Sequence, residues 1–177
     1  MSKNLTYGIL TGNIMETPAG LDEENLNFVQ LKSFLGSYFE NVASEDCEIL
    51  TNCDFGLQLV AAQAICARNL GRFLTCVIPF EEQPVKWYEH YRNIYFNVHK
   101  KCRRTVNLGF RPGSAGISDS EYYIANNADV ITLIKSKDEP VPAAVVHAFK
   151  KGKKIEVIEC ESLEVKLLKP QLPTKNQ

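Results

Sequence analysis

Short apolar runs alternate along this chain with longer segments whose apolar residues recur at helical spacing. The run from Phe73 to Ile78 is almost entirely apolar, as in strands buried on both faces of a sheet. Further strands are expected at 5–10, 47–50, 105–108, 129–134 and 155–158. Because strands alternate with helices, the sequence predicts an α/β fold: a three-layer, doubly wound, mainly parallel sheet.

The helical segments carry start and stop signals that set their expected bounds. Asp22 is a plausible N-cap for the first helix, Gly71 suits the end of the second, and Pro84 suits the first turn of the third. Helices are expected at 22–40, 57–70, 84–100, 119–127 and 140–151. The glycine- and serine-rich stretch 109–119 is expected to be a mobile loop.

Length and charge narrow the class of protein. The 177 residues suit one domain, expected at 1–160, followed by a tail at 161–177. Net charge is -1, which argues against a dedicated nucleic-acid binder, so nucleic acid is predicted to be an unlikely partner. No apolar run approaches the roughly 20 residues that span a bilayer, so no membrane partner is expected. The N-terminus lacks a signal-peptide pattern, and we expect a cytoplasmic protein.

The six cysteines show no metal-binding spacing, because no two of them form a Cys-x-x-Cys pair. The sequence therefore predicts no metal site, and reduced thiols that pack as small apolar residues. Cys53 stands out because it falls in a loop that can hold a ligand. Its thiol either packs in the core or acts as a nucleophile at a helix N-terminus.

Polar residues follow the predicted strands, at the edge of the sheet where ligands bind in open α/β folds. The first strand ends in a Thr-Gly-Asn turn, the second in a polar loop with a glycine, and the third in a loop with carboxylates and a carboxamide. The candidate ligand-binding residues are Thr11, Gly12, Asn13, Asn52, Asp54, Phe55, Gly56, Phe80, Glu81, Gln83 and Trp87.

The candidate catalytic carboxylates are Glu81, Glu82 and Asp54. A carboxylate at Glu81 or Glu82 either contacts ribose hydroxyls and acts as a general acid or base, or favours the dipole at a helix N-terminus. Asp54 either contacts ribose or caps the helix that follows.

Two further patterns have both a functional and a structural interpretation. Trp87, Tyr91 and Tyr95 recur at i, i+4 and i+8, which makes an aromatic stripe that either packs in the core or stacks on a ligand. The basic run 100–104 either holds an anion or stabilises a helix C-terminus.

Several motifs resemble one known family when they are taken in order. They are the Thr-Gly turn after the first strand, the glycine before a helix of small residues, Ile-Pro-Phe-Glu-x-Gln with Lys-Trp at 78–87, Asn-Asn-Ala-Asp at 126–129 and Lys-x-Gly-Lys at 150–153. This series resembles the YpsA-like branch of the SLOG superfamily, named after the DNA-processing protein DprA (also SMF) and the Lonely Guy enzymes. The resemblance implies a Rossmann-like fold, a pocket for a nucleotide-like ligand and a homodimer.

The chain departs from the family pattern where the family binds phosphate. The first turn lacks the family's His-Arg, the acid after the second glycine is Gln58, and Glu139-Pro140-Val141 stands where the family has Gly-Gly-Thr. Prolines at 140 and 142 remove N–H donors that a phosphate cradle needs. Phosphate binding in the family's manner is therefore disfavoured.

The sequence thus predicts a nucleotide- or nucleoside-derivative-binding protein of this superfamily, without robust catalysis and without a cofactor. One alternative is an enzyme that hydrolyses the N-glycosidic bond of a nucleoside or nucleotide. A second alternative is a protein-interaction module in which the pocket is vestigial.

Overall fold

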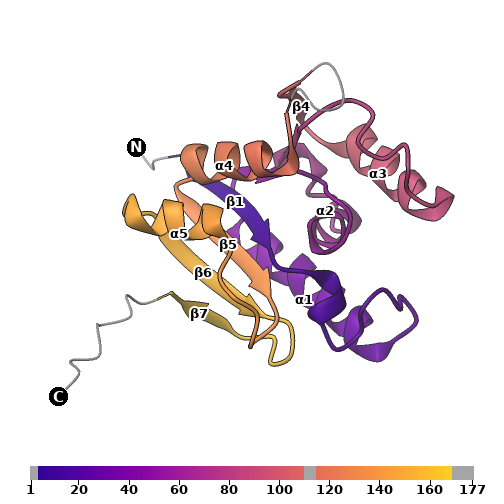
Figure 1. Ribbon diagram of the computed structural model, residues 1–177, viewed down its shortest axis with the longest axis horizontal. Helices are drawn as coiled ribbons and strands as arrows, with labels where there is room; N and C mark the ends of the chain where they lie inside the picture. Colours follow the sequence, from indigo (N-terminus) through magenta and orange to yellow (C-terminus); the bar gives the residue numbers. More distant parts are fainter. Residues whose placement is uncertain (1–3, 110–114, 169–177) are drawn as a thin grey trace.

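The computed structural model describes residues 4–109 and 115–168, which form one seven-stranded sheet covered by helices (Figure 1). The strands are β1 (Thr6–Thr11), β2 (Glu48–Thr51), β3 (Leu74–Ile78), β4 (Arg104–Asn107), β5 (Val130–Lys135), β6 (Lys154–Glu159) and β7 (Val165–Leu167). The α-helices are α1 (Leu26–Val42), α2 (Leu57–Ala67), α3 (Glu89–Lys101), α4 (Ile117–Asn127) and α5 (Ala143–Lys150). Short 3-10 turns lie at Ile14–Glu16 and Gly71–Phe73.

The sheet has the order β4-β3-β2-β1-β5-β6-β7, and every pairing is parallel except that of β6 with β7. The chain builds outward from β1 to β4 on one side, then crosses back to place β5 on the other side of β1. The predicted doubly wound, mainly parallel sheet is therefore confirmed.

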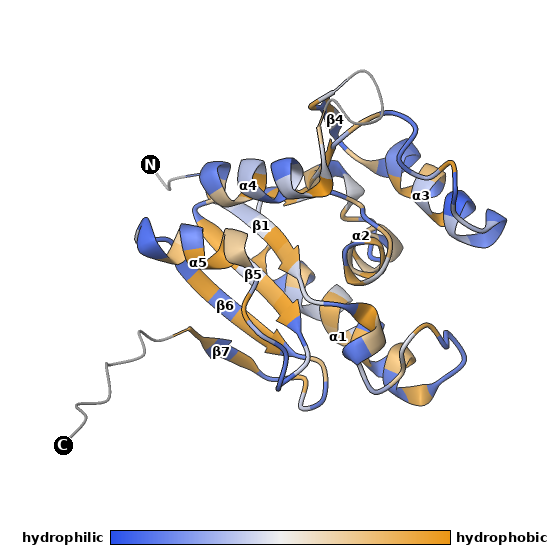
Figure 2. Ribbon diagram, in the orientation of Figure 1, coloured by the Kyte–Doolittle hydropathy of each residue, from blue (hydrophilic) through white to orange (hydrophobic). Residues whose placement is uncertain are grey.

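Alternate residues of the strands feed two cores. On β1, Ile9 packs with helices α1, α2 and α3, whereas Leu10 packs with α4 and α5. Ile49 and Leu50 divide in the same way on β2. The helices thus form one layer on each face of the sheet, with α4 and α5 together on one of them (Figure 1). Figure 2 shows the apolar character concentrated in the strands and on the inner helix faces.

Two helix starts lie later than the sequence predicts. The first helix begins at Leu26, because the Asn25 side chain accepts a hydrogen bond from the N–H of Asn27 and so caps it in place of Asp22. The third helix was expected from residue 84 but begins at Glu89. Successive turns occupy 80–87 instead, in which Gln83 N–H donates to the Phe80 carbonyl.

The second helix ends earlier than expected, at Ala67. Asn69 then takes a left-handed backbone conformation with φ 58°, and Gly71 opens a 3-10 turn rather than closing the helix. Gly71 is needed for another reason: a Cβ on it would lie 2.4 Å from the Lys101 carbonyl oxygen, so α3 packs directly on its backbone.

Both ends of the chain and the loop before α4 are only partly described. Residues 110–114 of the loop expected at 109–119 lie outside the described residues, as do 1–3 and 169–177. Part of the segment predicted as a tail forms β7, which pairs with β6 at the edge of the sheet. In the described part of the chain, no helix combines the length and the apolar character needed to cross a bilayer.

Candidate functional site

The carboxyl ends of β1, β2 and β5 surround a cleft of about 440 Å³. Because β1 is the strand at which the winding of the sheet reverses, this is the crevice where open α/β folds bind ligands. The lining residues come from the loops after these strands and from α4: Thr11, Gly12, Asn13, Ile14, Asn52, Asp54, Phe55, Gln58, Glu121, Glu139, Pro140, Val141 and Pro142.

The backbone donors beside β1 and β5 are already occupied by a side chain. The Glu139 carboxylate accepts hydrogen bonds from the N–H of Asn13, at 2.5 Å, and from the N–H of Ser136, at 3.3 Å. Gly12 allows this approach, because a Cβ there would lie 2.0 Å from a Glu139 oxygen. These backbone N–H groups thus already bind a carboxylate of the chain itself.

Hydrogen bonds fix the loop after β2. The buried Asn52 accepts from the N–H of Asp54 at 3.0 Å and donates to Ser120 Oγ of α4 at 3.2 Å. Gly56 has φ 109°, a conformation that favours glycine, and it opens α2. The loop is therefore held from both sides, and Asp54 lies over the cleft.

Gln58 forms a structural bridge between α2 and two strands. Its carboxamide donates to the Ile9 carbonyl at 2.7 Å and accepts from Thr51 Oγ1 at 2.7 Å. These two bonds join the first turn of α2 to both β1 and β2. Because both partners are buried, the bridge fixes the floor of the cleft.

Two half-buried carboxyl groups, those of Asp54 and Glu121, line the cleft. Burial raises the pKa of Asp54, an effect that hydrogen bonds from the Phe55 N–H and the Gln83 carboxamide partly offset. Burial also raises the pKa of Glu121, and the charge of Asp54 raises it further. Each of the two carboxyl groups is therefore harder to ionise than a carboxyl group in water.

The cleft has a strongly acidic lining. Asp54, Glu121 and Glu139 contribute carboxyl groups, and none of the described residues that line it is Lys, Arg or His. A multiply charged anion would meet repulsion here with no compensating cation. Hydroxyl, amide and cationic groups would find acceptors.

The structure separates the sequence-predicted residues into two groups. Those of the first two loops meet at the cleft, with Gly56 directly behind it. Glu81 and Glu82 are exposed and do not line it. Gln83 is buried and supports the loop from behind, since its Nε2 donates to the Asn52 carbonyl at 3.2 Å.

Phe80 is half-buried and Trp87 belongs to an aromatic cluster beside the cleft. The Phe55 ring lies 5.7 Å from Trp87 and 4.9 Å from Tyr91, and Trp87 lies 5.5 Å from Tyr95. The expected aromatic stripe thus packs mainly on itself and on Phe55, which is the ring that reaches the cleft.

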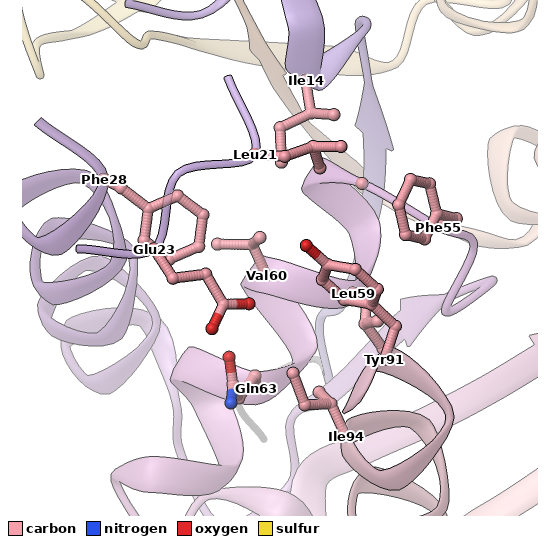
Figure 3. A pocket seen from close by; sticks show the side chains of 11 residues that line it. Ile14, Leu21, Glu23, Phe28, Phe55, Leu59, Val60, Gln63, Tyr91 and Ile94 are labelled. Carbon is pink, nitrogen blue, oxygen red and sulfur yellow. The ribbon is translucent and has the colours of Figure 1, made fainter. Parts of the chain in front are cut away.

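A second, apolar cavity lies behind Phe55, between α1, α2 and α3 (Figure 3). The rings of Phe28, Phe55 and Tyr91 surround it, and Glu23 at its rim pairs with His90 at 2.9 Å. Its volume of about 10 Å³ is that of a single water, so it is too small for a nucleotide-like ligand.

Sequence reasoning missed two features of the site. Glu121 of α4 lines the cleft because the sheet topology carries α4 there, and nothing local in the sequence indicates this position. The structure also brings Cys53, Cys76 and His99 together, although they lie far apart in the sequence and on three different elements.

Comparison with known proteins supports the fold. A solved structure of DNA processing protein A from Helicobacter pylori, described for its single-stranded DNA binding mode, matches with a TM-score of 0.58 at 10% identity. The match covers 87% of this chain and 65% of the other, so this chain spans about two thirds of that protein's length. No protein-family model matches the sequence, and no curated protein matches it.

This neighbour is one of the proteins after which the SLOG superfamily is named, so the predicted resemblance holds at the level of a Rossmann-like fold. It also corrects one expectation. The balanced charge was taken to make nucleic acid an unlikely partner, yet a protein with this fold is described as binding single-stranded DNA. Net charge alone misleads here because a local basic face can bind phosphates whatever the total.

Proposed function

We propose that this protein, a divergent relative of the YpsA-like branch, binds a nucleoside or a similar hydroxyl-rich nucleotide derivative in the cleft at the ends of β1, β2 and β5. The observation that carries the proposal is the Glu139 carboxylate seated on the backbone N–H groups of Asn13 and Ser136. That carboxylate takes the phosphate position, while the rest of the cleft keeps its acceptors.

The remaining groups suit a sugar and a flat ring. The carboxylate of Asp54 accepts hydrogen bonds from ribose hydroxyls, as does Glu121 from the opposite wall. Phe55 offers the edge of an aromatic ring at the mouth of the cleft, and its contacts with Trp87 and Tyr91 hold it in place. A phosphate on the ligand would face three carboxyl groups.

Calorimetric titration with adenosine and with its 5′-monophosphate tests the proposal. Adenosine is expected to bind more tightly than the monophosphate. Asp54→Asn is expected to weaken adenosine binding by about tenfold or more, since a lost hydrogen bond to a charged group costs roughly 1.5–3 kcal/mol.

The matched control is Glu82→Gln, which removes an exposed carboxylate outside the cleft and is expected to leave affinity unchanged. Tighter binding of the monophosphate, or equal losses in both variants, would refute the proposal.

The same carboxyl pair favours a second candidate, hydrolysis of an N-glycosidic bond. Such a reaction uses two carboxyl groups near the sugar, one of which gives a proton, and Asp54 and Glu121 both line the cleft with pKa values that burial raises. Release of free base from a nucleoside panel, abolished by Asp54→Asn but not by Glu81→Gln, is the expected result. Binding without any release would leave the protein a binder only.

A third candidate is single-stranded nucleic-acid binding along α3, which a stripe of side chains supports. Tyr88, Arg92, Phe96 and Lys100 follow one another at four-residue spacing, so aromatic and cationic groups alternate on one side of the helix. Tyr88 is 83% exposed and Phe96 is 51% exposed. Exposed rings between cations are the pattern on which unpaired bases stack.

Gel-shift titration with a single-stranded oligonucleotide at increasing salt tests this candidate. Affinity is expected to fall steeply with salt, and Phe96→Ala is expected to cost about 1–3 kcal/mol of binding. Tyr122→Ala, which removes an exposed aromatic ring from α4, serves as the control. Affinity that does not fall with salt and is the same in Phe96→Ala and the parent would contradict this candidate.

A further inference from the structure

Two buried thiols and an imidazole meet beneath the loop that carries Asn52 and Asp54. Cys53 and Cys76 are both fully buried, and their Sγ atoms lie 3.2 Å apart. A ring nitrogen of His99 completes a group in which all three donor atoms lie within 4.8 Å of one another. The donors come from the loop after β2, from the middle of β3 and from the last turn of α3.

The hydrogen bonds of His99 leave one nitrogen available on the inner side. Its Nδ1 lies 3.1 Å from Thr105 Oγ1, whereas its Nε2 is buried and has no hydrogen-bond partner among the described residues. Such an orphaned atom costs free energy unless something binds it. An imidazole held at Nδ1 by an oxygen, with a free Nε2, is the usual arrangement of a metal-ligating histidine.

A fourth donor stands beside these three. The Cys102 thiol follows His99 by three residues and donates to the His99 carbonyl at 3.3 Å, outside the group whose donor atoms lie within 4.8 Å of one another. Around a tetrahedral zinc ion with bonds of about 2.3 Å to sulfur, neighbouring sulfurs are about 3.8 Å apart. The Cys53 and Cys76 sulfurs, 3.2 Å apart, would separate slightly to reach this value, and the Cys102 thiol would turn from the His99 carbonyl toward them to serve as the fourth ligand.

The backbone at Cys53 is held in a conformation that ordinary residues avoid. Its φ is 52°, in the left-handed region, and its N–H donates to Thr51 Oγ1 at 3.1 Å. A residue other than glycine is strained there. This conformation accompanies the placement of the Cys53 thiol 3.2 Å from the Cys76 thiol.

We propose that Cys53, Cys76, Cys102 and His99 form a binding site for a divalent, thiol-preferring metal ion of the zinc class. Three thiolates and one imidazole make a closed tetrahedral set, which is typical of a structural zinc site. Binding releases the thiol protons to solvent and changes no oxidation state. The ion would clamp the loop after β2 to β3 and α3, directly behind the cleft.

The test uses the full-length protein, stripped with a chelator under reducing conditions and titrated first with Co²⁺ and then with Zn²⁺. One equivalent of Co²⁺ is expected to give the visible bands of a tetrahedral site and a thiolate charge-transfer band. Zn²⁺ is expected to abolish both and to raise the melting temperature. A metal-to-protein ratio far from one, or octahedral Co²⁺ bands, would overturn the proposal.

Three variants separate the site from a general effect of thiols. His99→Gln removes a partly exposed ligand without opening the core, and Cys76→Ala removes a central one. Each is expected to weaken Co²⁺ binding at least tenfold. Cys160→Ala removes a buried thiol outside the cluster and is expected to bind as the parent does.

Thr105→Val tests the site through a hydroxyl that supports His99 and also lies 3.9 Å from the Cys102 sulfur. It keeps all four ligands and removes the hydroxyl beside Nδ1, so weaker binding with an unchanged circular dichroism spectrum is expected. Equal Co²⁺ binding by Cys76→Ala and the parent would refute the site. So would a Cys53–Cys76 disulfide that persists in reductant and excludes metal, detected as a mass two hydrogens lower.

Discussion

Glu139 decides what the cleft can accept, because its carboxylate is bonded to two backbone N–H groups. Replacing it with alanine frees both donors and removes one negative charge. We therefore expect Glu139→Ala to bind inorganic phosphate at least tenfold more tightly than the parent, as measured by the shift of melting temperature with phosphate concentration.

Asp138→Ala is the matched control, since it removes the neighbouring exposed carboxylate and no hydrogen bond to the cleft is known for it. An equal gain in both variants would show that net charge, rather than the occupied donors, excludes phosphate.

Asp54 is expected to make stability depend on pH in an unusual direction. Burial raises its pKa above the ordinary 3.8, so the native protein keeps the proton at pH values where the unfolded chain has lost it. The free energy of unfolding therefore falls as the pH rises through this interval. In Asp54→Asn this loss is absent, and the stability of the variant relative to the parent is expected to grow from acidic to neutral pH.

Urea unfolding at a series of pH values measures this difference. Asp138→Asn should show no comparable trend, because that carboxylate is exposed. A difference between Asp54→Asn and the parent that stays constant with pH would contradict the explanation by burial.

Packing of α4 on β1 depends on a position that has no side chain. A Cβ on Gly8 would lie 2.6 Å from Ile124 Cγ2 and 2.8 Å from Ala128 Cβ. Gly8→Ala is expected to cost about 1–3 kcal/mol through overpacking, measured by urea unfolding. Gly116→Ala, where the nearest atom is 3.5 Å away, is expected to be nearly neutral.

Helices and strands were predictable where one signal dominated. The apolar run at 73–78 identified β3, and the glycine at 56 placed the start of α2. The start of α3 was not predictable from Pro84, because the turns that displace it depend on Gln83 reaching the Asn52 carbonyl across the fold. Propensity cannot report such a tertiary contact.

Tyr38 joins helix α1 to the strands β5 and β6 of the sheet. Its hydroxyl lies 3.0 Å from Thr132 Oγ1 on β5 and donates to Glu156 Oε2 on β6 at 2.5 Å. Tyr38→Phe removes the hydroxyl and leaves Thr132 Oγ1 and Glu156 Oε2 without this hydrogen-bond partner. The expected cost is about 1–3 kcal/mol of unfolding free energy in urea.

Tyr88→Phe removes an exposed hydroxyl and is expected to change stability by less than about 0.5 kcal/mol. A cycle with Thr132→Val checks the link directly: if the two substitutions are simply additive, Tyr38 and Thr132 are not coupled.

At the scale of the whole molecule, the doubly wound sheet followed from alternation, and so did the meeting of the loops after β1 and β2. The contribution of α4 did not, because nothing local in the sequence says that Glu121 faces Asp54. The same holds for Cys53, Cys76 and His99, whose proximity is a product of strand order. Spacing rules detect only ligands that lie near one another in the chain.

The Glu139 carboxylate competes with any bound anion for the backbone N–H groups of Asn13 and Ser136. A tethered group acts at an effective concentration of the order of millimolar or above, and this one is anchored only three residues from Ser136, one of the donors it occupies. A dissolved phosphate compound must displace the Glu139 carboxylate before its phosphate can accept a hydrogen bond from either N–H group. The cleft would then select ligands by their need for these two donors. Compounds present at micromolar levels would bind only if their binding requires no hydrogen bond from the N–H groups of Asn13 and Ser136.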